Sequence, residues 1–149
     1  MTRNAKPWIL IGLLATMGQL AWAQSSPVGV WKSIDEKTQA PKAQVRISDQ
    51  GGVLVGHVEK ILATDTAADA VCDQCTDDRK GQRIQGLEII RGVKKVDDNA
   101  WDGGTILDAK EGKVYKVSLK PIEGGKKLEV HGYIGFALIG RTQTWVRVE

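Results

Sequence analysis

The sequence is poor in the side chains that build metal and cofactor sites. Among 149 residues there are two cysteines, two histidines and one phenylalanine. A structural zinc site needs four ligands, and the spacing of His57 and His131 gives no reason to bring them to the two cysteines. We therefore expect no bound metal and no other cofactor.

Catalytic motifs are also missing. No G-x-S-x-G nucleophile motif occurs, and no glycine-rich loop stands between a predicted strand and a predicted helix. Three carboxylates, Asp35, Asp108 and Glu111, fall in or beside predicted turns, where they accept hydrogen bonds from backbone N–H groups. Because no nucleophile, base and orienting acid can be picked out, we expect that the protein is not an enzyme.

The chain has no apolar run long enough to cross a membrane as a helix. Its longest, Trp8–Leu20, has about 13 residues, whereas a spanning helix needs about 20. Arg3 and Lys6 precede this run, and Ala21-Trp22-Ala23 follows it as an A-x-A cleavage pattern. Residues 1–23 are thus predicted to be a signal peptide, cleaved near Ala23/Gln24. Residues 24–149 would form a single domain in the periplasm or outside the cell, with no membrane span.

Charge of one sign does not dominate the predicted mature chain. The full sequence has 21 basic and 18 acidic side chains, and loss of Arg3 and Lys6 with the leader leaves 19 against 18. A surface so close to neutral has no broad positive field, so we expect no nucleic-acid partner.

Helical periodicity is absent, and short runs of alternating apolar and polar residues replace it. Such alternation, separated by glycine-containing turns, predicts antiparallel strands joined as hairpins. The predicted strands are Gly29–Ser33, Ala43–Ile47, Val53–Leu62, Ile84–Arg91, Ala100–Leu107, Lys113–Lys120, Lys127–Tyr133 and Gly140–Val148. Eight strands in this order can close into an up-and-down barrel, which leaves no exposed sheet edge.

Two segments interrupt the strand pattern. Residues 63–83 form one long polar connection, which we expect to hold a short helix or to lie as a flap over the barrel mouth. Ile134–Ile139 is a second segment outside the strands. The long connection contains Cys72 and Cys75, which most simply form a disulfide in an oxidising compartment. The alternative is a redox-active thiol pair, although Asp73, Asp77 and Asp78 would raise rather than lower a thiol pKa.

The motifs, taken in order, resemble a known bacterial family. They are Gly29-Val30-Trp31, Cys72-x-x-Cys75, Gly86-Leu87-x-Ile89-x-Arg91-Gly92, Trp101-x-Gly103-Gly104-x-Ile106-x-Asp108, Gly112-Lys113-x-Tyr115, Gly132-Tyr133-Ile134-Gly135 and Gly140-Arg141-Thr142-Gln143-x-Trp145-x-Arg147. Across residues 29–147 they are similar to the secreted family called domain of unknown function 2147. That resemblance implies a lipocalin-like barrel, in which Trp31 closes one end beneath Arg141 or Arg147.

Two functions remain open at this stage. The first is binding of a small apolar or amphiphilic ligand inside the barrel, lined by Tyr115, Trp101, Phe136 and Arg91. The second is a structural or interaction protein of the cell envelope with a filled barrel, which acts through residues 63–83 and 134–139. The sequence makes no prediction about the oligomeric state.

Overall fold

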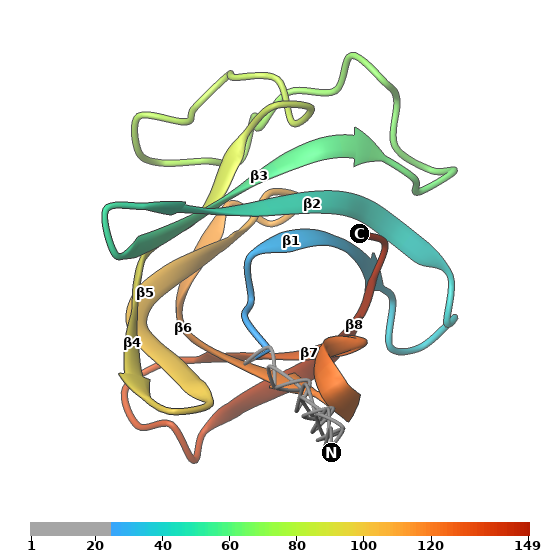
Figure 1. Cartoon of the computed structure of the whole chain (residues 1–149). Coiled ribbons are helices and arrows are strands. Elements are labelled where there is room, and N and C mark those ends of the chain that lie inside the picture. The colour runs from blue at the N-terminus through green and yellow to red at the C-terminus, as the bar shows by residue number, and fades with distance from the viewer. Residues whose placement is uncertain (1–24) are drawn as a thin grey trace, which may run out of the picture.

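A computed structural model shows residues 25–149 as a closed barrel of eight antiparallel strands (Figure 1). Each strand pairs with the next along the chain, and β8 pairs with β1 to close the ring. The strands are β1 (Gly29–Ile34), β2 (Pro41–Gln50), β3 (Val53–Ile61), β4 (Glu88–Asp97), β5 (Ala100–Asp108), β6 (Lys113–Ile122), β7 (Lys127–Tyr133) and β8 (Gly140–Arg147). The predicted up-and-down barrel is confirmed.

Alternation along the strands places one set of side chains inside the barrel. Trp31 of β1 lies opposite Val45 of β2, which in turn lies opposite Val58 of β3. On the other wall, Leu119 of β6 lies between Trp101 of β5 and Val130 of β7. All of these side chains are buried in one apolar cluster. The inner face of the barrel is therefore the hydrophobic core.

The fourth strand differs from the prediction. It was expected at Ile84–Arg91, but β4 begins at Glu88 and continues to Asp97. Gly92, with a φ of 70°, forms a bulge at this point, and β4 continues beyond it. Residues 84–87 belong instead to the end of the long connection.

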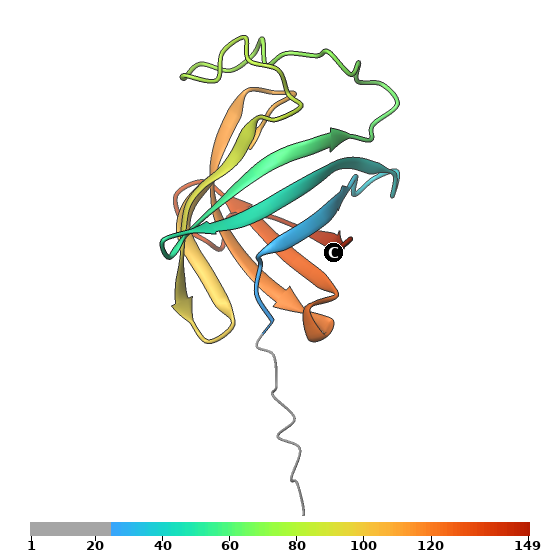
Figure 2. The same ribbon diagram turned by 45° about the horizontal axis from the view of Figure 1, so that its top comes forward.

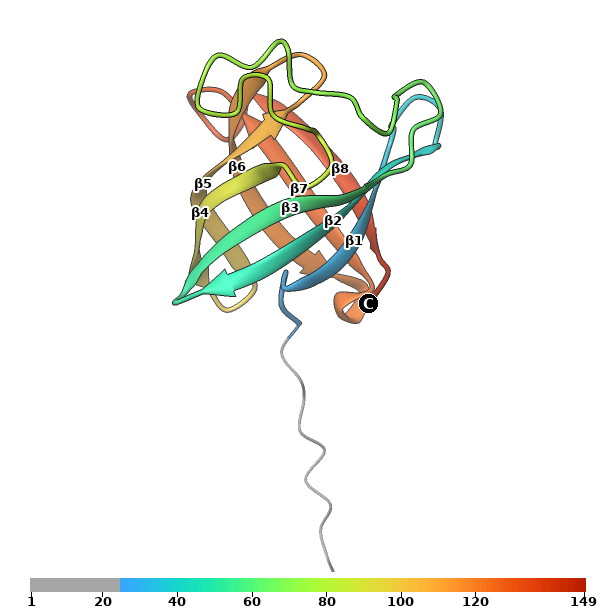
Figure 3. The same ribbon diagram turned by 90° about the horizontal axis from the view of Figure 1, so that it is seen from above.

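The two ends of the barrel are built differently (Figures 2 and 3). At the closed end the start of β1 meets the last residue of the chain, since Val30 N–H donates to the carbonyl of Glu149 at 2.8 Å. A short 3₁₀ turn, Glu123–Gly125, also lies there between β6 and β7. At the open end are the long connection and the β1–β2, β5–β6 and β7–β8 loops.

The long connection between β3 and β4 contains no helix, so that expectation is wrong. It runs along the rim and the outer wall near β3 and β4 rather than across the mouth (Figures 1 and 3). Two ion pairs join it to the rest of the barrel. Arg91 of β4 binds Asp78 at 2.8 Å, and Lys110 of the β5–β6 loop binds Asp65 at 3.2 Å.

Within residues 25–149, no helix has the length and hydropathy needed to cross a membrane. The predicted signal peptide and its cleavage point lie outside the described residues.

Candidate functional site

The closed end is sealed by Trp31 and Arg147. The Arg147 guanidinium carbon lies 4.1 Å from the Trp31 ring centroid, over an indole that is 0% exposed. The same guanidinium donates to three backbone carbonyls, those of Gly125, Val28 and Ser26, at 2.5, 3.0 and 2.7 Å. Burial lowers the pKa of Arg147, and no carboxylate pairs with it among the described residues. This residue ties the N-terminal segment to the base of the barrel.

Arg141 does not share this role, and its predicted part in closing the barrel is wrong. It lies opposite Gly132 at the open end of β8, whereas Arg147 lies opposite Trp31. Its side chain is 74% exposed and approaches Glu36 of the β1–β2 loop at 3.6 Å.

Two of the four predicted ligand-lining residues face the interior. Trp101 is 7% exposed, and Lys95 lies over its ring at 5.6 Å. Tyr115 is partly buried higher on the inner wall, next to Ile106 and Gly132. They are far apart along β5 and β6, because Trp101 lies opposite Leu119 and Tyr115 lies opposite Ile106. Whether either contacts a ligand stays a prediction.

The other two do not line the interior, which corrects the sequence-based placement. Arg91 points to the outer wall, where Glu88 binds it at 2.6 Å and Asp78 at 2.8 Å. These carboxylates raise the pKa of its guanidinium, and leave no free cation for a ligand head group. Phe136 is 78% exposed on the β7–β8 loop, because β7 ends at Tyr133.

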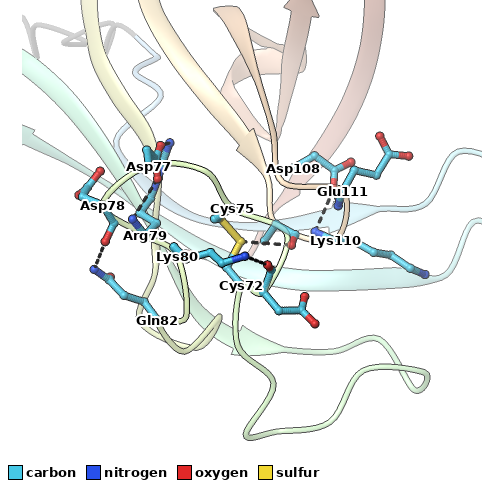
Figure 4. Close-up of a disulfide and its surroundings, with 12 residues drawn as sticks. Cys72, Cys75, Asp77, Asp78, Arg79, Lys80, Gln82, Asp108, Lys110 and Glu111 are labelled. Carbon is cyan, nitrogen blue, oxygen red and sulfur yellow. Dashed lines mark hydrogen bonds and ion pairs between the residues drawn. A yellow bond between two sulfur atoms is a disulfide. The ribbon is translucent and has the colours of Figure 1, made fainter.

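Cys72 and Cys75 form the predicted disulfide (Figure 4). Both are buried, at 0% and 1% exposure, and Cys72 Sγ lies 3.4 Å from the carbonyl oxygen of Ala109. Gly112 fits tightly beneath this loop, since a Cβ there would stand 2.0 Å from the carbonyl oxygen of Gln74. The disulfide thus packs the long connection against the β5–β6 hairpin and offers no accessible sulfur for exchange.

An ion pair between buried Arg79 and exposed Asp77 reinforces the same region. Arg79 is 2% exposed; it binds Asp77 at 2.6 Å and donates to the carbonyl of Glu88 at 3.0 Å. Hydrogen bonding from Arg79 lowers the pKa of Asp77 to about 2. The pair is satisfied on both sides, so it holds structure and leaves no reactive group.

Two pockets stand out, one on the outer wall and one at the closed end. A depression of about 590 Å³ separates the outer faces of β2 and β3 from the long connection; Gln44, Glu59, Lys60 and Thr66 line it. A pocket of about 360 Å³ lies at the closed end, against Asp49, Lys95, Trp101 and Ser25. The centre of the barrel is occupied by side chains.

No group of three or more His, Cys, Asp or Glu side chains gathers as a metal site in the part of the chain that the structure describes. His57 instead faces Glu88 on the outer wall, at 3.5 Å. His131 binds the backbone of the β7–β8 loop through Ala137.

Four exposed large apolar side chains gather on the β7–β8 loop, Ile134–Ile139. Ile134, Phe136, Leu138 and Ile139 are 67%, 78%, 98% and 67% exposed. Patches of this kind on a soluble protein mark interaction sites. The sequence placed this segment outside the strands, and β7 and β8 end and begin beside it as predicted. The exposure of its side chains was not predicted.

The fold and the sealed end define a lipocalin-like barrel protein. The family model for "Uncharacterized protein conserved in bacteria (DUF2147)" matches residues 29–147, and the chain belongs to that family. Among solved structures, the chain is similar to protein HP1028 from Helicobacter pylori, described as belonging to the lipocalin family. The two share 16% identity over 84% of each chain, with a TM-score of 0.72. No curated protein matches the sequence.

Proposed function

We propose that this protein is an exported, non-catalytic binding protein of the bacterial cell envelope, whose packed barrel displays the β7–β8 loop to another envelope component. One observation carries this proposal: the barrel interior is filled, whereas four large apolar side chains of Ile134–Ile139 stand exposed. Export is supported by the basic and apolar start of the sequence with its A-x-A pattern. The disulfide fits an oxidising compartment.

Photo-crosslinking in the producing bacterium tests the proposal. A photoreactive phenylalanine analogue would replace Leu138, which is 98% exposed, or Val96 of β4, which is 62% exposed near the closed end. Crosslinks to lipid or protein are expected at position 138 and not at position 96. Equal crosslinking at both positions, or none at 138, contradicts the proposal.

A second candidate is binding of a small apolar or amphiphilic ligand within the open end of the barrel. It is favoured by Tyr115 and Ile106, which are only partly buried on the inner wall and face the side-chain-free Gly132. Native mass spectrometry of the purified protein separates the two candidates. A bound mass that disappears in Gly132→Leu would favour the ligand site, whereas a bare chain in wild type would exclude it.

A further inference from the structure

The β7–β8 loop is unusual because it carries no polar side chain at all. Its six residues are Ile134, Gly135, Phe136, Ala137, Leu138 and Ile139. Leu138 at the tip is 98% exposed and Phe136 is 78% exposed. A protein interface normally surrounds its apolar centre with hydrogen-bonding groups. This loop offers a partner only hydrocarbon from its side chains.

The loop has a defined shape. His131 Nε2 lies 2.5 Å from the carbonyl oxygen of Ala137, and its Nδ1 lies 2.8 Å from Thr142 Oγ1. Within the loop, the N–H of Ile139 donates to the carbonyl of Phe136 at 2.9 Å. These bonds pair the carbonyls of Phe136 and Ala137 and the N–H of Ile139, so the loop holds a defined turn while its large apolar side chains stay exposed.

Cations stand at the base of the loop. Exposed Lys116 of β6 lies opposite Tyr133, and Arg141 of β8 lies opposite Gly132. Arg141 is 74% exposed beside Glu36, while Lys116 has no ion-pair partner among the described residues. Leu138 is three residues from Arg141, and an extended chain spans at most about 3.3 Å per residue, so the tip stands no more than about 10 Å beyond this cation. That reach matches the 5–10 Å by which interfacial apolar groups enter a bilayer, with cations left among the head groups.

We propose that Ile134–Ile139 inserts into the surface of a lipid bilayer that contains anionic lipid. Phe136 and Leu138 enter the acyl boundary, and Lys116 and Arg141 face the lipid phosphates. The β7–β8 side of the open end then faces the membrane, and the closed end with Gly29 and Glu149 faces away. The long connection, which carries Asp65, Asp69, Asp73, Asp77 and Asp78, lies on the β3–β4 side, across the barrel from this loop (Figure 1). This inference rests on the proposed function, because it names the envelope component that the loop contacts.

Co-sedimentation with vesicles tests the inference. The protein is purified in the form that the bacterium accumulates, and is mixed with vesicles of phosphatidylglycerol and phosphatidylethanolamine. The double variant Phe136→Ser/Leu138→Ser should bind at least about tenfold more weakly, because two large apolar side chains no longer leave water. Val96→Ser, which removes an exposed apolar side chain at the other end, should bind like wild type. Urea midpoints confirm that both variants fold.

Two further measurements sharpen the result. Lys116→Glu should weaken binding several-fold on the anionic vesicles and leave binding to pure phosphatidylcholine unchanged. A new indole in Leu138→Trp should be quenched by brominated acyl chains, whereas the native Trp31, Trp101 and Trp145, at 0%, 7% and 2% exposure, should not.

The inference is overturned if wild type does not sediment with the vesicles, or if Val96→Ser lowers binding as much as the loop variant. Crosslinking of position 138 to a protein, without vesicle binding, contradicts insertion into a bilayer but agrees with the proposed function. Absence of any crosslink at position 138 contradicts both the bilayer insertion and the proposed function.

Discussion

At the scale of single residues, Arg147 stabilises the closed end of the barrel through the groups that its guanidinium contacts. It covers Trp31 and donates to three backbone carbonyls. We expect Arg147→Ala to lower the free energy of unfolding by about 3 kcal/mol, since two part-buried carbonyls and one exposed carbonyl lose a charged donor and Trp31 loses its cover. Urea denaturation measures this change.

The matched control is Arg141→Ala. That side chain is 74% exposed and its carboxylate partner is 3.6 Å away, so its loss should cost no more than about 0.5 kcal/mol. If the two variants lose equal stability, the carbonyl bonds of Arg147 do not hold the closed end.

Gly112 offers a second residue-scale prediction. Its φ is 70°, and a Cβ would stand 2.0 Å from the Gln74 carbonyl oxygen. Gly124 has a similar φ of 65° but nothing within 4 Å. Both Gly→Ala variants carry the strain of a left-handed backbone, about 1 kcal/mol. Gly112→Ala should lose about 1–3 kcal/mol more, because the clash separates the disulfide loop from the hairpin. Equal unfolding midpoints for the two variants would show that the loop moves away freely.

At the scale of elements, the strands could be predicted because alternation is a local pattern in the sequence. The position of the long connection could not be predicted in this way. Val45 and Ile47 alternate with exposed Arg46, and this pattern alone locates β2. The long connection is joined to the barrel by pairs such as Arg91 with Asp78 and Lys110 with Asp65, whose members are 13 and 45 positions apart in the chain. The sequence contains both carboxylate partners of Arg91 but does not show that they pair with it. Arg91 was therefore predicted to contact a ligand.

Some residues of the candidate site could be predicted from the sequence and others could not. Trp31 and the disulfide could be assigned from motifs and compartment. The end of β7 at Tyr133 was also predicted, and it places Phe136 outside the strands. The exposure of the Phe136 side chain could not be predicted, because an apolar residue in a short run predicts burial equally well.

The ion pair in the long connection should make the free energy of unfolding depend on pH in the acid range. Hydrogen bonds from Arg79 hold the pKa of Asp77 at about 2, against an ordinary value of 3.8. A carboxylate with a lowered folded pKa contributes its full stability above the unfolded value, and loses it as pH falls through the folded value. The urea midpoint of wild type should therefore decline as pH falls from 3.8 towards about 2.

The variant Asp77→Asn lacks this titration. It should be less stable than wild type at neutral pH, because Arg79 loses its carboxylate. The difference between the two proteins should shrink as the wild-type carboxyl takes up its proton. Asp69→Asn, on an exposed residue of the same loop, should follow the wild-type curve. A constant gap between Asp77→Asn and wild type at all pH values would exclude this linkage.

At the scale of the whole molecule, the decisive property is the packed interior, because a hollow barrel binds ligands inside and a filled one must act through its surface. Leu119 of β6 is 1% exposed and lies between Trp101 and Val130. Leu119→Ala should cost about 2–5 kcal/mol and leave an apolar cavity. A dry cavity of that kind takes up a small apolar guest such as benzene.

Benzene should therefore raise the melting temperature of Leu119→Ala and leave that of wild type unchanged. The control is Val114→Ala on the same strand, where the side chain is 44% exposed and truncation makes no cavity. An increase in the wild-type melting temperature would mean that space for a guest already exists inside. Binding would then be expected within the barrel, near Tyr115, and the β7–β8 loop would lose its place as the main binding surface.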